Sequence, residues 1–232
     1  MHALAGFTRI RPSQGSKAAR DRVARLSTDG DIGWLPAIDV VGEGVFLILD
    51  PKSLVAWEDA LRSAPDRVAG MRASYEEVLR DQGWEDPRSP LTPRFVLLHT
   101  LAHVLINEWS LDCGYPAASL RERVYVDDEM AGILLYTATS DSAGSLGGIV
   151  AQGERARLAG SLAQALERAS WCSADPLCME TEAGGIDGLN LAACHNCVLL
   201  PETSCEMNNT FLDRAHLVGT PEGDFPGYFT VV

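Results

Sequence analysis

The sequence predicts a mixed α/β fold, in which helices pack on a small mixed sheet and an irregular cysteine-rich segment follows near the C-terminus. Three observations support this class. Segment 89–114 is apolar nearly all round, as a buried helix would be. A buried-strand pattern, "AGILLYTA" (131–138), precedes a Gly-rich loop and an amphipathic helix at 154–170. After residue 171 regular periodicity stops and the cysteines begin.

The chain of 232 residues, 46% of them hydrophobic, is long enough for one substantial core. We therefore expect residues 1–232 to form a single domain. Within it we distinguish an N-terminal part of strands and helices (1–88), a central helix–strand–helix part (89–170) and a cysteine-rich segment (171–214).

The N-terminal part should begin with strands and continue with helices. Proline opens the helix expected at 51–63, where it needs no backbone N–H. The other expectations are a short strand at 3–12, a loop with a helical piece at 15–33, two strands at 34–50 joined by a tight turn at Gly42–Gly44, and a helix at 71–84.

The strongest helix signal lies at 89–114. Thr92 and Pro93 are typical of a helix start, and Gly114 is typical of a stop. Since its apolar residues are not confined to one face, we expect it to be the central buried helix. Beyond it, "SLRERVYVDD" (119–128) reads as a short helix or turn, and 139–153 as a loop.

Five cysteines share the last third of the chain, spaced Cys172-x5-Cys178-x15-Cys194-x2-Cys197-x7-Cys205. A C-x-x-C pair can direct two thiolates at one ion, and structural zinc sites are closed by four such ligands. The segment has few large apolar residues, so a bound metal would help to order it. Reduced buried cysteines and disulfides are the alternatives, and the isolated Cys113 reads as a core thiol.

Two features favour an enzyme instead. Glu180, with Cys178 before it and the C-x-x-C pair after it, resembles the signature of zinc nucleobase deaminases, although Ala193 stands where that signature has proline. His99 and His103 lie four residues apart on the expected central helix, so both can face one metal or hydrolytic site.

The net charge and the absence of a recognisable targeting signal limit the possible partners and the expected location of the protein. Lysine and arginine number 19 against 32 acidic residues, giving a net charge of −13. This charge opposes non-specific nucleic-acid binding and suits a basic protein partner. We see no signal peptide and no apolar stretch long enough for a membrane span, so we expect a cytoplasmic protein with reduced thiols.

Six motifs in order resemble the MrfA zinc-binding domain family, in the form found in DrmB-type proteins of DISARM anti-phage systems. They are "GFTRI", "WLPAIDVVGEGVFL", "LHTLAHVLI", "LLYTATSDSAGSLGGI", "CSADPLC" and "ACHNCVLLPETSCEMNNTFLDR". The resemblance implies zinc as the cofactor. It also implies the ligands Cys178, Cys194, Cys197 and Cys205, with Cys172 as a substitute.

In this family the domain accompanies superfamily 2 helicases, while the sequence itself holds no Walker A and no D-E-x-H motif. The resemblance therefore implies a non-enzymatic accessory module of a helicase-type defence or repair complex. Its partner would be a helicase or ATPase subunit. Arg155, Arg157 and Arg214 are candidates for contacts with that partner or with nucleic acid.

Overall fold

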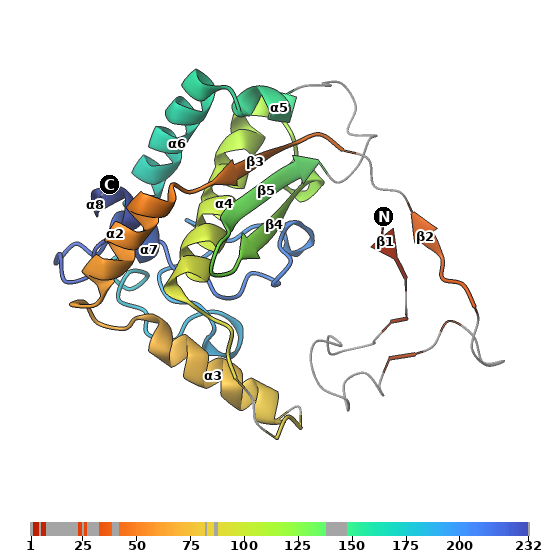
Figure 1. Ribbon diagram of the computed structural model, residues 1–232, viewed down its shortest axis with the longest axis horizontal. Helices are drawn as coiled ribbons and strands as arrows, with labels where there is room; N and C mark the ends of the chain where they lie inside the picture. Colours follow the sequence, from red (N-terminus) through yellow and green to blue (C-terminus); the bar gives the residue numbers. More distant parts are fainter. Residues whose placement is uncertain are drawn as a thin grey trace.

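The computed structural model describes residues 2–4, 6–7, 23–24, 26, 33–38, 42–81, 83–85, 88–137 and 148–231. Its centre is an antiparallel sheet in the order β3–β5–β4, formed by β3 (Gly44–Ile48), β4 (Leu120–Val126) and β5 (Ala131–Thr137). Helices and a long irregular C-terminal segment pack beside this sheet (Figure 1). The predicted mixed α/β class is confirmed, with a sheet whose described strands are all antiparallel to their neighbours.

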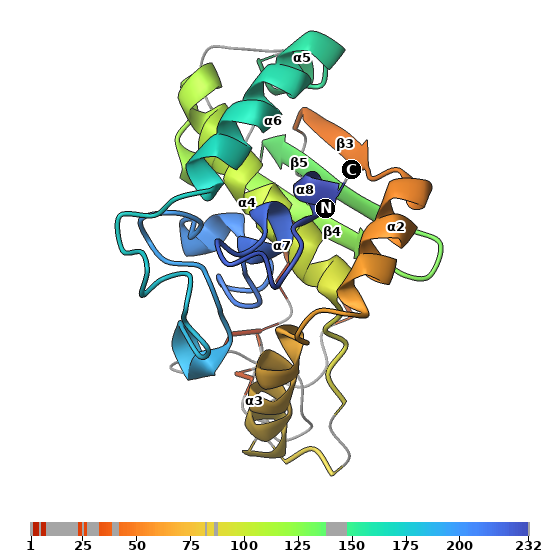
Figure 2. The same cartoon turned by 90° about the vertical axis from the view of Figure 1, so that its left-hand side faces the viewer.

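Helix α4 (Pro93–Cys113) is the buried core of the molecule. It contacts β4 and β5 on one side and α6 (Arg155–Ala169) and α7 (Ala215–Val218) on the other (Figure 2). Thr92 caps its first turn, and Gly114 ends it in the left-handed conformation, with φ 70°. The predicted central helix and both of its end signals are confirmed.

Replacing Thr92 with alanine should lower the free energy of unfolding by about 1 kcal/mol. The Thr92 hydroxyl oxygen accepts a hydrogen bond of 3.1 Å from the Phe95 backbone N–H, which has no partner within the helix. Urea denaturation would measure the loss. Thr92→Ser, which keeps the oxygen, should stay close to the original stability; an equal loss in both variants would contradict the cap.

Several of the other helices follow the predicted pattern. Helix α2 (Pro51–Leu61) buries Leu54 and Trp57, and its first turn is capped by Asp50. The remaining elements are α3 (Val68–Asp81), α5 (Gly148–Gln152), α8 (Tyr228–Val231), the short 3₁₀ turns η1 (Ala117–Ser119), η2 (Ile186–Gly188) and η3 (Glu202–Ser204), and the strands β1 (His2–Ala3) and β2 (Ala37–Ile38).

Two strand predictions were wrong. β2 and β3 do not pair with each other as the hairpin predicted at 34–50 requires, because β2 pairs with β1 while β3 pairs with β5 in another sheet. Residues 120–126 are strand rather than helix or turn. Here Leu120 and Glu122 face inward while Arg123 and Tyr125 are exposed, and the run of charged residues concealed this alternation.

Parts of other predicted elements lie outside the described residues. These are most of the strand at 3–12, most of the loop at 15–33, and residues 139–147 of the predicted Gly-rich loop. Among the residues that are described, no helix is both long and apolar enough to cross a lipid bilayer.

Candidate metal centre

The segment after α6 brings four cysteines together through tight turns. Cys172 lies three residues beyond the end of α6. Backbone hydrogen bonds from Asp175 N–H to Cys172 C=O (2.9 Å) and from Cys178 N–H to Ala174 C=O (3.0 Å) then fold the chain back. In the second turn, the Cys197 N–H donates to the Cys194 C=O at 3.1 Å. Each turn therefore presents two thiols toward the other.

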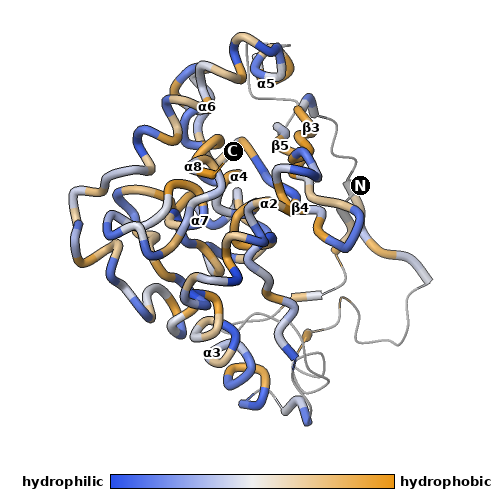
Figure 3. Tube along the Cα trace, turned by 60° about the vertical axis from the view of Figure 1, so that its left-hand side comes forward, coloured by the Kyte–Doolittle hydropathy of each residue, from blue (hydrophilic) through white to orange (hydrophobic). Residues whose placement is uncertain are grey.

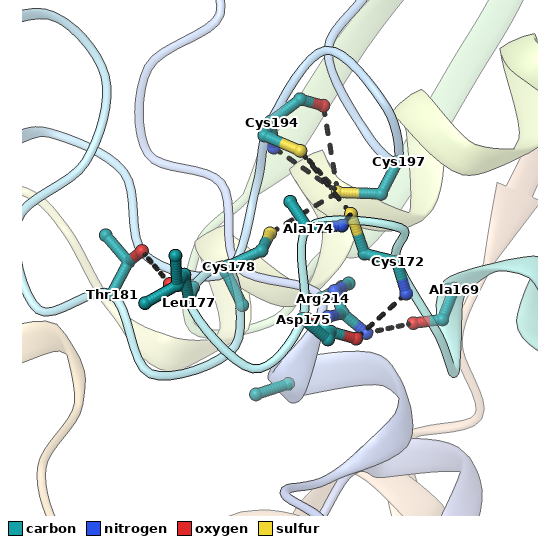
Figure 4. Close-up of polar contacts among 12 residues, drawn as sticks. Ala169, Cys172, Ala174, Asp175, Leu177, Cys178, Thr181, Cys194, Cys197 and Arg214 are labelled. Atoms are coloured by element: carbon teal, nitrogen blue, oxygen red, sulfur yellow. Dashed lines mark hydrogen bonds and ion pairs between the residues drawn. The ribbon is translucent and has the colours of Figure 1, made fainter.

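The four sulfurs face one another (Figure 4). Sγ–Sγ distances are 3.5 Å for Cys172–Cys194, 3.8 Å for Cys178–Cys197 and 3.6 Å for Cys194–Cys197. Four sulfurs bound to one zinc at about 2.3 Å would stand about 3.8 Å apart at the corners of a tetrahedron. All four sulfurs lie within 4.8 Å of one another. The arrangement thus fits a closed tetrahedral zinc site.

The pKa values of these thiols also indicate a site that requires a bound cation. Burial, followed by the charge of Cys194, raises the pKa of Cys178 to about 11, and burial raises the pKa of Cys197 as well. Burial opposes ionisation of Cys194 too, but the Asn196 backbone N–H and the neighbouring thiols lower its pKa. A dication bound by all four sulfurs would compensate both the burial and the neighbouring thiolate charges that raise the pKa of Cys178 and Cys197.

A buried arginine lies below the four sulfurs. Arg214 is fully buried, donates to the Ala169 carbonyl at the end of α6 (2.9 Å) and pairs with Asp175. Asp175 in turn accepts a hydrogen bond from the Cys172 backbone N–H at 2.8 Å. Arg214 and Asp175 neutralise each other, and together they hold the first turn against the end of α6.

The grouping of cysteines corrects the one expected from the resemblance. Cys172, expected only as a substitute, completes the group, and Cys205 lies outside it with His99, His103 and Glu122. The reason is local: Ser204, just before Cys205, donates to the Ala117 carbonyl at 2.8 Å and holds this part of the chain beside η1 and β4. The turn at 172–178 meanwhile carries Cys172 toward Cys194.

Other predicted residues lie away from the four sulfurs. Cys113 is half-buried, near Gln152, and Glu180 is exposed. Arg155 and Arg157 are exposed on α6, as a contact with a partner requires. Arg214 cannot serve that role, because its side chain is fully buried. The expectation of a surface contact at Arg214 was therefore wrong.

Two residues of these clusters were missed or undervalued by reasoning from the sequence. The signal for Cys172 was its place in "CSADPLC", where proline and aspartate favour a turn that returns the chain to its start. The signal for Glu122 was a carboxylate at an inward position of an alternating strand, Leu120-x-Glu122-x-Val124. The charged residues Arg121 and Arg123 on either side of Glu122 conceal this alternation.

Comparison with known proteins agrees with this geometry. Residues 101–198 match the MrfA Zn-binding domain, a range that contains Cys172, Cys178, Cys194 and Cys197. The chain is also 37% identical, over 226 residues, to a DISARM protein DrmB from Bacillus paralicheniformis. That match covers 97% of the chain, and the chain spans 40% of the relative's length. Residues 101–198 are thus similar to the MrfA Zn-binding domain, and this match and the four-cysteine group together support zinc as the cofactor, in a chain that is similar to a DISARM protein DrmB over 97% of its own length.

Proposed function

We propose that the chain is a non-enzymatic, zinc-binding accessory module of a helicase-type complex, acting in DISARM-like anti-phage defence or in DNA repair. The observation that carries the proposal is the closed set of four sulfurs at Cys172, Cys178, Cys194 and Cys197, in a chain similar to a DISARM protein DrmB. A zinc held by four protein ligands has no open position for water or substrate, so its role is structural.

In this role zinc orders a segment that lacks a continuous apolar face. Hydrophobic and hydrophilic residues alternate over short distances along the loops between α6 and α7 (Figure 3). The metal joins the two turns, and Arg214 joins them to α6. We propose that the chain acts as one domain, in which the zinc-binding segment 171–214 is fixed to the central part.

The rival enzymatic functions have weaker support. A deaminase needs a glutamate beside a zinc that keeps one position open, whereas Glu180 is exposed and the four sulfurs form a closed set. His99 and His103 are fully buried, which suits a structural role better than access by a substrate.

The partner should be a helicase or ATPase subunit. With a net charge of −13, the chain favours association with a basic protein face. Exposed Arg155 and Arg157 on α6 could add contacts to nucleic acid. However, Arg157 lies 3.6 Å from Glu154, and Arg168 on the same helix lies 2.8 Å from Glu108. Because Arg157 and Arg168 have these acidic neighbours, nucleic-acid binding by the chain alone should be weak and salt-dependent.

The proposal predicts that a helicase subunit co-purifies with the tagged full-length chain from its native host. Recovery should fall at least about tenfold for Cys194→Ser, because loss of a zinc thiolate unfolds the segment that the metal orders. Cys113→Ser, outside the four-cysteine group, is the matched control and should recover the subunit normally. Quantitative mass spectrometry of the purified complexes provides the measurement.

Three results would contradict the proposal. They are recovery of no helicase or ATPase subunit with the unmodified chain, deamination or ATP hydrolysis by the purified chain, and tight DNA binding that persists at high salt. The last would favour a different function, that of a module that binds DNA on its own.

A further inference from the structure

A second group of potential metal ligands lies inside the molecule, between α4 and the sheet. His99 and His103 come from α4, Glu122 from β4, and Cys205 from the loop after η3. All four are buried, and one ligand atom of each lies within 4.8 Å of the others. Three separate parts of the chain thus direct nitrogen, oxygen and sulfur atoms at one point.

The distances are close to those of a tetrahedral site. His99 Nε2 lies 2.8 Å from Glu122 Oε1 and 3.2 Å from Cys205 Sγ, and His103 Nε2 lies 3.5 Å from the same carboxylate oxygen. Ligands bound at about 2.0–2.3 Å to one zinc would be separated by about 3.3–3.7 Å. Two of the three observed separations are slightly shorter than the range around zinc, so these ligands would move slightly apart to bind the ion.

Several of these atoms have no hydrogen-bond partner among the described residues. Oε2 of Glu122 and Nε2 of His103 are buried without a hydrogen bond, and the carboxylate's contacts are ion-pair distances from Oε1 to His99 Nε2 (2.8 Å) and His103 Nε2 (3.5 Å). Buried polar atoms normally find a partner, and a buried carboxylate needs its charge compensated. A cation between them would satisfy the carboxylate and the imidazole together.

Neighbouring groups already orient two of the ligands for a metal. His103 Nδ1 lies 3.1 Å from the Val198 carbonyl, so it carries the proton and leaves the Nε2 lone pair free. Cys205 Sγ accepts backbone N–H groups from Met207 (3.3 Å) and Asn209 (3.2 Å), which stabilise a thiolate. Such secondary contacts are typical of bound histidine and cysteine ligands.

The charges of the group also balance a divalent ion. One carboxylate, one thiolate and two neutral imidazoles around a dication have a net charge of zero, which makes the site compatible with full burial. The mixture of nitrogen, sulfur and oxygen donors suits zinc better than calcium or magnesium, which take oxygen ligands.

We propose that His99, His103, Glu122 and Cys205 form a second, structural zinc site, distinct from the four-cysteine site and beyond the function proposed above. Its four protein ligands join α4, β4 and the loop that follows the four-cysteine group. Val198, which orients His103, directly follows Cys197 of the first site. The loop between Cys197 and Cys205 is thus fixed at both ends by metal sites.

Metal content and coordination test the proposal on the full chain, purified after expression with zinc. We expect about two zinc ions per chain and, from zinc X-ray absorption, about 2.5 sulfur ligands per zinc on average, because one site has four sulfurs and the other has one. Glu122→Gln and His103→Gln should lower the content to about one zinc and raise the average to about four sulfurs. Cys113→Ser should keep both values of the unmodified chain.

One zinc per chain with four sulfur ligands in the unmodified protein would overturn the proposal and leave the buried group as a metal-free ion-pair network. The absorption measurement on the unmodified chain gives this answer even if a variant fails to fold. Neither outcome bears on helicase co-purification, so the second site and the accessory function are tested separately.

Discussion

Replacing Cys172 with serine should release the zinc of the four-cysteine site and unfold segment 171–214. In small peptides, the free energy of zinc binding to a structural site is about 10–16 kcal/mol. This is comparable to the free energy of unfolding of a whole domain, which is about 5–15 kcal/mol. Serine cannot replace a thiolate ligand at neutral pH. The remaining three thiols would then be close together without a compensating cation, and the turn at 172–178 would lose its connection to Cys194.

Zinc content and limited proteolysis would measure this effect. Proteolysis should cut the variant within 171–214 at protease concentrations that leave the unmodified chain intact. Cys113→Ser is the control and should keep both zinc and protection. Cys205→Ser tests the grouping directly: it should keep the zinc bound by four sulfurs, whereas the ligand set expected from the resemblance requires its loss. A Cys172→Ser protein that retained four-sulfur zinc would contradict the structure.

Replacing Asp213 with alanine should lower the free energy of unfolding by about 3–5 kcal/mol, because it leaves buried partners without their counter-charge. Asp213 is fully buried. It accepts hydrogen bonds from Arg67 at 2.9 and 3.2 Å, and lies 3.0 Å from His216 Nδ1. Its Oδ1 atom also accepts the backbone N–H groups of Ala192 (3.3 Å) and Ala215 (3.1 Å). The carboxylate thus joins the residue before α3, the middle of the zinc-binding segment and the start of α7.

Urea denaturation at neutral pH would measure the loss. Asp59→Ala is the matched control, because Asp59 pairs with Arg62 at 3.1 Å on the surface, where both side chains are more than half exposed. Removing such a surface pair should change stability by at most about 1 kcal/mol. A similar small change for Asp213→Ala would show that the buried network is not required.

The same carboxylate predicts a pH dependence. Although burial opposes ionisation, the contacts with His216 and Arg67 hold the pKa of Asp213 well below its ordinary value. The unfolded chain binds a proton at about pH 4, so the stabilisation is complete above that pH and is lost as pH falls below it. The difference in stability between the unmodified chain and Asp213→Asn should therefore shrink as the pH is lowered below about 4.

The sequence by itself determined the features that rest on local signals. Thr92, Pro93 and Gly114 fixed the ends of α4, because capping and left-handed backbone are properties of single residues. The apolar composition of 93–113 placed that helix in the core, and the spacing of Cys194 and Cys197 predicted a metal-binding turn. The resemblance supplied zinc, which the family match and the cysteine cluster support.

Only the tertiary structure decided which distant residues meet. Spacing along the chain left five cysteines for four positions. The choice of Cys172 over Cys205 depends on where α6 ends and on how Ser204 holds its loop beside η1. Likewise, Glu122 reaches His99 and His103 because β4 packs on α4, a contact between residues about twenty positions apart in separate elements. Such contacts follow from the packing of elements against one core, and no local pattern specifies that packing.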